Sequence, residues 1–261
     1  MTKMTLIASL IFILLFGLSS CSTSPTGRKK LKLISSSQIN SMGAQSFEQM
    51  KSKSKISRNP SYTRLVKCLS YDLLVSAGQD PNAWEVQVFE DDTANAFALP
   101  GNKIGVHTGM IKTAQNPHQL AAVIGHEIGH VLAEHGNERV SQNMVAQGGL
   151  MAASIMLGEP NEKNRLLIGA LGLGAQFGVL MPFSRKHETE ADRLGVQYMA
   201  RAGYNPIEAS RLWVVMGQGG HSVPEFLSTH PSPGSRVKDL EAYAQNFMGT
   251  YSKNKAKASC L

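Results

Sequence analysis

The order of apolar and polar residues predicts two helices in the first third of the chain. Apolar side chains recur every three or four positions over residues 35–50, and again over residues 60–78. The segment between them, residues 51–58, is basic and polar, which indicates a turn. Both stretches are therefore expected to form amphipathic helices that bury one face.

Three short strands are expected next. Residues 84–90 alternate between apolar and polar, the pattern of a half-buried strand. Two shorter apolar runs, 95–99 and 103–107, flank Pro100-Gly101-Asn102, which is typical of a tight connection between strands.

The chain after Thr108 is predicted to be helical with breaks. Asn116 is of the type preferred at a helix N-cap and Pro117 suits the first helical position, so a helix is expected from there to Gly136. Further helices are expected around residues 186–201, 206–216 and 235–247. These elements predict an α+β fold class, mainly helical with a small three-stranded sheet.

Two apolar segments lie in the middle of the chain, at residues 144–157 and 166–183. The second is rich in glycine and alanine, and Gln176 is its polar residue. Because the segment lies inside the domain and is built of small residues, we expect a closely packed helix or a flap near a site rather than a membrane span.

The N-terminus has the pattern of a bacterial lipoprotein leader. Lys3 precedes the apolar run Leu6–Leu18, which falls short of the about 20 apolar residues that a spanning helix needs. Small residues then lead to Cys21, as in a lipobox, and Ser22 favours the outer membrane. We expect Cys21 to be acylated; the alternative is an ordinary signal peptide cut nearby.

Charge and cysteine content fit this location. The chain has 26 lysines and arginines against 19 acids, a formal net charge of +7, which favours an anionic neighbour. Secretion separates the chain from nucleic acid. The expected neighbour is therefore an anionic membrane, and nucleic acid is not an expected partner. Cys68 and Cys260 remain in an oxidising compartment, where a disulfide between them is possible, but the sequence does not show that the two thiols meet.

The strongest chemical signal is His126-Glu127-Ile128-Gly129-His130, an H-E-x-x-H motif on the helix expected after Asn116. Histidines four positions apart share one helix face and bind one zinc ion, while Glu127 deprotonates a zinc-bound water. Two surface histidines are the alternative, which the apolar neighbours disfavour. By helical extrapolation His135 points away from His130 and is expected at the surface.

A second motif, Glu188-Thr189-Glu190-Ala191-Asp192, follows some sixty residues later. H-E-x-x-H followed by E-x-x-A-D resembles the CAAX prenyl protease family of gluzincins, and most closely its soluble periplasmic lipoprotein members. Other segments similar to that family are residues 24–28, 95–101 and His230-Pro231 with Arg236. Only a helix and a tail are expected after Arg236, without the helical-repeat domain that some members carry.

The resemblance implies roles for single residues. Glu188 is the expected third zinc ligand, with Glu190 as its rival, and Asp192 orients a zinc-bound histidine. His230 either stabilises the oxyanion or fills the fourth zinc position and keeps the site closed. Arg236 either holds a substrate carbonyl or anchors the loop of His230.

A strand beside the zinc helix is the expected substrate site. An exposed sheet edge there would bind extended polypeptide through backbone hydrogen bonds, and the residues expected to do so are Lys103, Ile104, Gly105, Val106 and His107. The alternative is a packed structural strand.

Together these features predict a zinc metalloendopeptidase with one Zn²⁺ per chain, anchored by lipid to the outer membrane of a Gram-negative envelope and facing the periplasm. Its expected substrates are unfolded or stalled outer-membrane proteins, and the outer-membrane assembly machinery is a further expected partner. The alternative is a chaperone-like lipoprotein with a structural or self-inhibited zinc site. The expected division is a signal peptide at 1–20, an acylated cysteine and basic tether at 21–34, the protease domain at 35–250 and a basic tail at 251–261.

Overall fold

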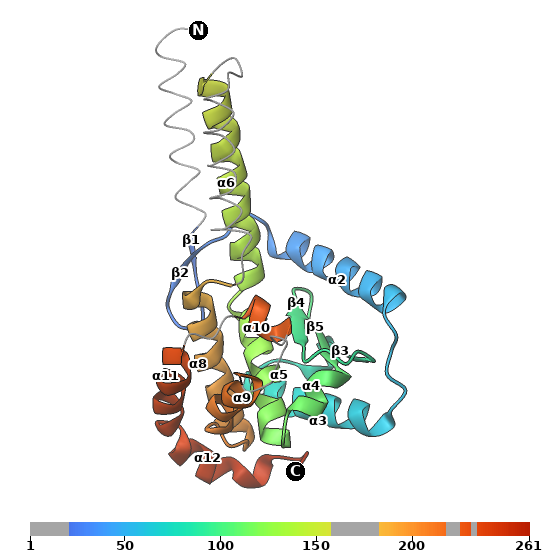
Figure 1. The fold of residues 1–261 in the computed structure, drawn as a ribbon. Helices are drawn as coiled ribbons and strands as arrows, with labels where there is room; N and C mark the ends of the chain where they lie inside the picture. The colour runs from blue at the N-terminus through green and yellow to red at the C-terminus, as the bar shows by residue number, and fades with distance from the viewer. Residues whose placement is uncertain (1–20, 158–182, 218–224, 231–233) are drawn as a thin grey trace. The chain divides into compact units, whose positions relative to one another are not determined.

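The computed structural model of the chain describes residues 21–157, 183–217, 225–230 and 234–261 (Figure 1). The expected signal peptide and nearly all of the apolar segment 166–183 lie outside these ranges. Within the described part of the chain, no helix is both long and apolar enough to cross a membrane.

The chain divides into two compact units. One consists of Met1–Ser36 and Asn137–Leu180, and the other of Ser37–Gly136 and Met181–Leu261. The domain boundaries expected near residues 34 and 250 stay predictions.

The first unit contains a β-hairpin beside a long helix. Strand β1 (Cys21–Thr23) pairs antiparallel with β2 (Lys29–Leu31), and the unit continues in helix α6 (His135–Leu157) from Asn137 onwards. The guanidinium of Arg28 donates two hydrogen bonds to the carboxylate of Glu138 in α6, at 2.9 and 2.7 Å. Such a bidentate, partly buried pair fixes orientation better than a single contact. The expected tether thus includes a short hairpin held against α6.

The second unit is mainly helical and contains the sheet. Its helices and strands are α2 (Ser36–Lys53, from Ser37), α3 (Pro60–Ser76), η2 (Pro81–Ala83), β3 (Glu85–Phe89), β4 (Ala96–Leu99), β5 (Lys103–His107), α4 (Thr108–Thr113), α5 (Pro117–Leu132), α8 (Arg185–Ala202), α9 (Glu208–Gly217), α10 (Glu225–Thr229), α11 (Gly234–Gln245), α12 (Met248–Asn254) and η4 (Lys255–Lys257). The predicted α+β class, mainly helical with a three-stranded sheet, is confirmed.

The order of the sheet is β3-β5-β4. β5 pairs parallel with β3 and antiparallel with β4, so its backbone is hydrogen-bonded on both sides. The expectation that residues 103–107 form an exposed, peptide-binding edge is therefore wrong. It failed because β3 pairs with β5 in parallel, on the side away from β4, and a hairpin pattern reveals only the antiparallel neighbour. The edge strands are β3 and β4.

Small residues let α5 and α8 pack closely, side by side in Figure 1. A Cβ added to Gly129 of α5 would lie 3.0 Å from the carbonyl oxygen of Ala191 in α8. One added to Gly195 of α8 would lie 3.0 Å from the backbone nitrogen of His126. This approach brings the two motifs face to face.

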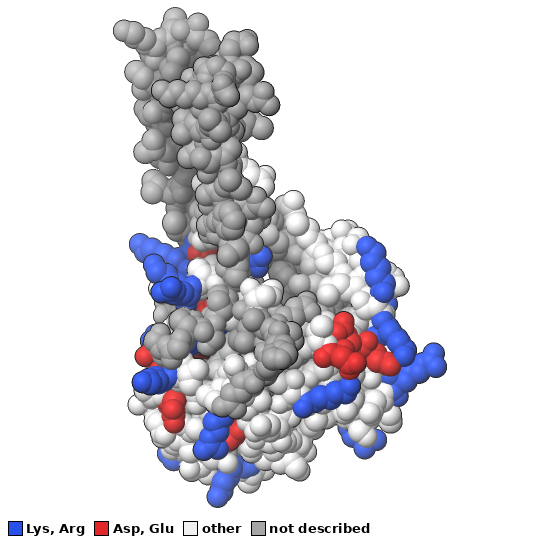
Figure 2. Space-filling view, in the orientation of Figure 1, with Lys and Arg blue, Asp and Glu red and all other residues white. Residues whose placement is uncertain are grey.

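Charged side chains around the β3 edge form a mixed network. Lys51 and Lys103 pair with Glu85 at 2.5 and 2.8 Å, and Lys55 pairs with Glu90 at 2.6 Å. Figure 2 shows such neighbouring blue and red side chains on the face it draws. The patch at this edge therefore carries charges of both signs.

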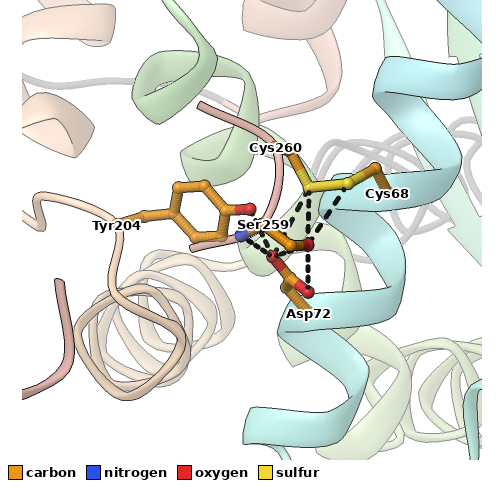
Figure 3. The surroundings of a disulfide bond; sticks show 5 residues. All are labelled: Cys68, Asp72, Tyr204, Ser259 and Cys260. Carbon is orange, nitrogen blue, oxygen red and sulfur yellow. Dashed lines mark hydrogen bonds between the residues drawn. A yellow bond between two sulfur atoms is a disulfide. The ribbon is translucent and has the colours of Figure 1, made fainter. Parts of the chain in front are cut away.

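A disulfide joins Cys68 of α3 to Cys260 near the C-terminus, with the two Cα atoms 5.9 Å apart (Figure 3). Beside it, Asp72 accepts hydrogen bonds from the hydroxyl of Tyr204 at 2.6 Å and from the backbone nitrogen of Ser259 at 3.0 Å. Of the two states that the sequence left open for these cysteines, the structure has the paired one. The C-terminal tail is thereby tied to α3.

Candidate active site

Helix α5 places the two histidines of the first motif. The side chain of Asn116 accepts a hydrogen bond from the backbone nitrogen of Gln119 at 3.0 Å, and Pro117 begins the helix, which confirms the predicted cap. One turn separates His126 from His130, and their Nε2 atoms lie 3.0 Å apart. Both side chains are buried.

Helix α8 brings Glu188 to the same point. Ser184 caps this helix by accepting a hydrogen bond from the backbone nitrogen of His187 at 3.3 Å. The Glu188 carboxylate has Oε1 at 3.3 Å from Nε2 of His130 and Oε2 at 3.5 Å from Nε2 of His126. A third imidazole completes the group.

That imidazole belongs to His230, which follows α10. Its Nδ1 lies 3.2 Å from Nε2 of His126 and 3.0 Å from Oε1 of Glu188. The rings of Phe226 and Phe183 stack on it, with centroids 4.4 and 5.3 Å away. His230 is therefore held in the group by packing on two aromatic rings as well as by polar contacts.

These four residues fit a divalent metal ion. Their ligand atoms all lie within 4.8 Å of one another, and all four side chains are buried. Tetrahedral zinc with bonds of about 2.0–2.2 Å separates its ligand atoms by roughly 3.3–3.6 Å. The closest separations in the group are 3.0–3.5 Å. Nitrogen lone pairs and a carboxylate crowded together in a buried site are best satisfied by a cation.

The pKa shifts of two of these residues, His130 and Glu188, are consistent with such a site. Burial lowers the pKa of His130 well below its ordinary value, which keeps the imidazole neutral as metal binding requires. Burial alone would raise the pKa of Glu188, but the polar contacts with His130 and His230 outweigh it and lower that pKa. A neutral imidazole and an ionised carboxylate are the forms that bind zinc.

Glu127 lies beside the four ligand residues and points toward the sheet. Its Oε2 accepts a hydrogen bond from the backbone nitrogen of Ala98 in β4 at 3.0 Å, and its Oε1 lies 3.5 Å from Nε2 of His230. Burial raises the pKa of the Glu127 carboxyl above its ordinary value, against the lowering effect of His230 and His126. A raised pKa brings a carboxylate closer to the range in which it works as a general base at neutral pH.

Asp192 and Arg236 support the ligands from behind. Asp192 Oδ1 lies 2.9 Å from Nδ1 of His126, the ring nitrogen on the far side from the metal position. Arg236 donates to both oxygens of Asp192, at 2.6 and 2.9 Å, and pairs with Glu188 at 2.8 Å. Burial would raise the pKa of Asp192, but the charge of Arg236 lowers it.

Arg236 has the contacts of an anchor. Besides its acidic partners it donates to the carbonyl oxygen of His230 at 3.5 Å, and its guanidinium stacks over the ring of Trp213 at 3.9 Å. Of the two roles that the sequence left open, these contacts match the anchoring of the His230 segment.

Comparison with known proteins identifies the family. The family model described as "Peptidase family M48" matches residues 60–244, which include both motifs, His230 and Arg236. The chain belongs to peptidase family M48. This is a family of metallopeptidases, and the resemblance seen in the two motifs of the chain is confirmed.

Two groups of M48 relatives are similar to the chain. "Mitochondrial metalloendopeptidase OMA1" of Schizosaccharomyces pombe is 34% identical over 191 residues, which cover 70% of this chain and 54% of the relative. "Beta-barrel assembly-enhancing protease" of Escherichia coli K12 is 28% identical over 252 residues, which cover 91% of this chain and 51% of the relative. The chain spans about half the length of these curated relatives.

The position of His135 in this M48 site was predicted wrongly from the sequence. It was expected at the surface, yet it is fully buried, with Nδ1 2.9 Å from Nδ1 of His130 and Nε2 3.1 Å from Glu190. The extrapolation failed because α5 ends at Leu132 and the backbone turns at Glu134, whose φ is 57°. Glu190, which lies two positions after Glu188 in the second motif, was the one feature of the sequence that pointed to a buried partner for His135.

Proposed function

We propose that this M48 chain is a zinc endopeptidase that holds one zinc ion through His126, His130 and Glu188. The convergence of these three ligands beside a buried glutamate, Glu127, carries the proposal. Imidazole and carboxylate ligands in a tetrahedral arrangement suit zinc. When bound, the ion supplies Lewis-acid chemistry that acidifies a water molecule and polarises the scissile carbonyl.

The chain's own residues supply the rest of the reaction. Glu127, held by Ala98, takes the proton of the attacking water and delivers it to the leaving amine. Asp192 keeps His126 oriented, and Arg236 holds Asp192 in place. Because these contacts are buried, they are strong and fix the ligands before substrate arrives.

Strand β4 is the proposed substrate-binding edge, in place of β5. It is an edge strand of the sheet, and the backbone nitrogen of Ala98 points away from β5 toward Glu127. An extended polypeptide added along β4 would run past the catalytic glutamate. Recognition through backbone hydrogen bonds selects unfolded chains with little regard to their sequence.

The proposed setting is the periplasmic face of a Gram-negative outer membrane, reached through a lipid on Cys21. The lipoprotein-like leader supports this, as does the similarity over 91% of the chain to a protease named for β-barrel assembly. Unfolded or stalled outer-membrane proteins are the proposed substrates, and the assembly machinery is a proposed partner. The relatives named mitochondrial support the same chemistry in a different compartment.

The zinc chemistry is tested on the purified mature protein. We expect about one zinc ion per chain by mass spectrometry and cleavage of unfolded casein. Treatment with 1,10-phenanthroline should abolish cleavage, and added zinc should restore it. A metal-free protein that cleaves casein as fast as the zinc-loaded one would contradict the proposal.

The anchor is tested separately in cells. We expect the protein to incorporate labelled palmitate and to sediment with outer membranes. The Cys21→Ala variant should carry no label and stay unprocessed. An unlabelled wild-type protein would contradict the anchor and leave the zinc chemistry unaffected.

One observation favours a second function, the holding of unfolded outer-membrane proteins without cleavage. His230 stands where a fourth ligand would close the site, and a closed site of four protein ligands is typical of structural zinc. A catalytically dead variant that still relieves envelope stress would favour this function over proteolysis.

A further inference from the structure

The structure contains a second buried contact between α8 and a histidine of α5, besides that of Asp192 with His126. It runs from Glu190 through His135 to His130, with the Glu190 Oε2 to His135 Nε2 distance at 3.1 Å and the two Nδ1 atoms 2.9 Å apart. The exposed fractions of Glu190, His135 and His130 are 4%, 0% and 3%. His187 stacks on the ring of His135 with centroids 4.4 Å apart.

The direction of these hydrogen bonds follows from the chemistry of imidazole. If His130 binds a metal through Nε2, its proton lies on Nδ1, which then donates to Nδ1 of His135. His135 must accept there, so its own proton lies on Nε2 and is donated to the Glu190 carboxylate. Each donor thus meets an acceptor, and each tautomer is set by its neighbour.

We propose that His135 and Glu190 are positioning residues that hold His130 in its metal-binding orientation and tautomer. The inference rests on the zinc centre proposed above. It assigns to His130 the kind of support that Asp192 gives to His126, with an imidazole inserted between the carboxylate and the ligand.

The geometry explains why an inserted imidazole is needed. Glu188 and Asp192 are one turn apart on α8 and face α5, while Glu190 lies between them in sequence and projects from a different side of the helix. The turn at Glu134 brings His135 into the space between Glu190 and His130. One helix therefore supports both histidine ligands.

The test compares two replacements of His135 in the full mature protein. Glutamine can accept from His130 through its carbonyl and donate to Glu190 through its amide, whereas leucine can do neither. Zinc affinity is measured by competition with a chromophoric chelator. We expect His135→Leu to bind zinc about 10- to 100-fold more weakly than wild type and His135→Gln to recover most of that loss. A role in packing alone would affect both variants alike.

Variants of Glu190 give an independent measurement if His135→Leu does not fold. Glu190→Gln keeps an acceptor for His135 and should retain most of the affinity, while Glu190→Leu should lose about as much as His135→Leu. His118→Leu is the matched control, because His118 is half-buried and contacts Tyr204 and Asn205 instead. It should bind zinc as wild type does.

The outcomes separate this inference from the proposal beneath it. A wild-type protein that binds no zinc would contradict the metal centre itself. A wild-type protein that binds zinc, with folded leucine variants at both positions that bind it equally tightly, would overturn the positioning role. Weak binding in the leucine variants together with recovery in the glutamine variants supports it.

Discussion

Replacement of Glu127 by glutamine is expected to abolish peptide hydrolysis and to leave zinc bound. Glutamine has the size of glutamate and can still accept from the backbone nitrogen of Ala98, so the site should keep its shape. The amide cannot take a proton from water, and loss of a general base slows a reaction by about 10²- to 10⁴-fold. Glu127 is outside the group of four ligand residues, so metal content should not change.

The measurement pairs initial rates of casein cleavage with zinc content per chain. Glu90→Gln is the matched control, because this exposed glutamate pairs with Lys55 at the surface, and it should keep the wild-type rate. A Glu127→Gln variant that cleaves at full rate would remove this residue from the mechanism. In cells, the same variant decides between proteolysis and holding, since only a holding function survives it.

The features that could be predicted from the sequence depend only on residues close together along the chain. The cap at Asn116 and the four-residue spacing of His126 and His130 are local, and the structure has both. The positions of the three strands were likewise predicted, one from alternation and two from short apolar runs on either side of a turn. Their order was not, because the parallel pairing of β3 with β5 depends on how the whole unit packs.

The parts of the site that could not be predicted depend on breaks in regular structure. His135 was misplaced because one residue, Glu134, takes a positive φ and ends the helical extrapolation. The contact between His126 and His230 spans 104 positions, a separation at which only resemblance to a family suggested proximity. Phe183 and Phe226, which stack on His230, had no signal in the sequence that distinguished them from core residues.

Replacement of His230 by alanine is expected to increase the rate of peptide hydrolysis. In the structure, Nδ1 of His230 lies 3.2 Å from His126 and 3.0 Å from Glu188, where a fourth ligand would exclude water and substrate. The other three ligands stay in place without it, so zinc should remain bound. If nine-tenths of the molecules are closed in this way, opening the site raises the rate by about tenfold.

The rate of casein cleavage, normalised to zinc content, measures this effect. His118→Ala serves as the control for removal of a histidine outside the site. A rate that falls by about 10²- to 10³-fold would instead assign His230 to oxyanion stabilisation, since that is the typical loss for one oxyanion donor. An unchanged rate would remove His230 from both roles. Phe226 and Phe183 hold the His230 ring by stacking, so the site of the wild-type protein opens only when His230 leaves these two rings. A substrate that binds along β4 beside Glu127 is placed to displace His230.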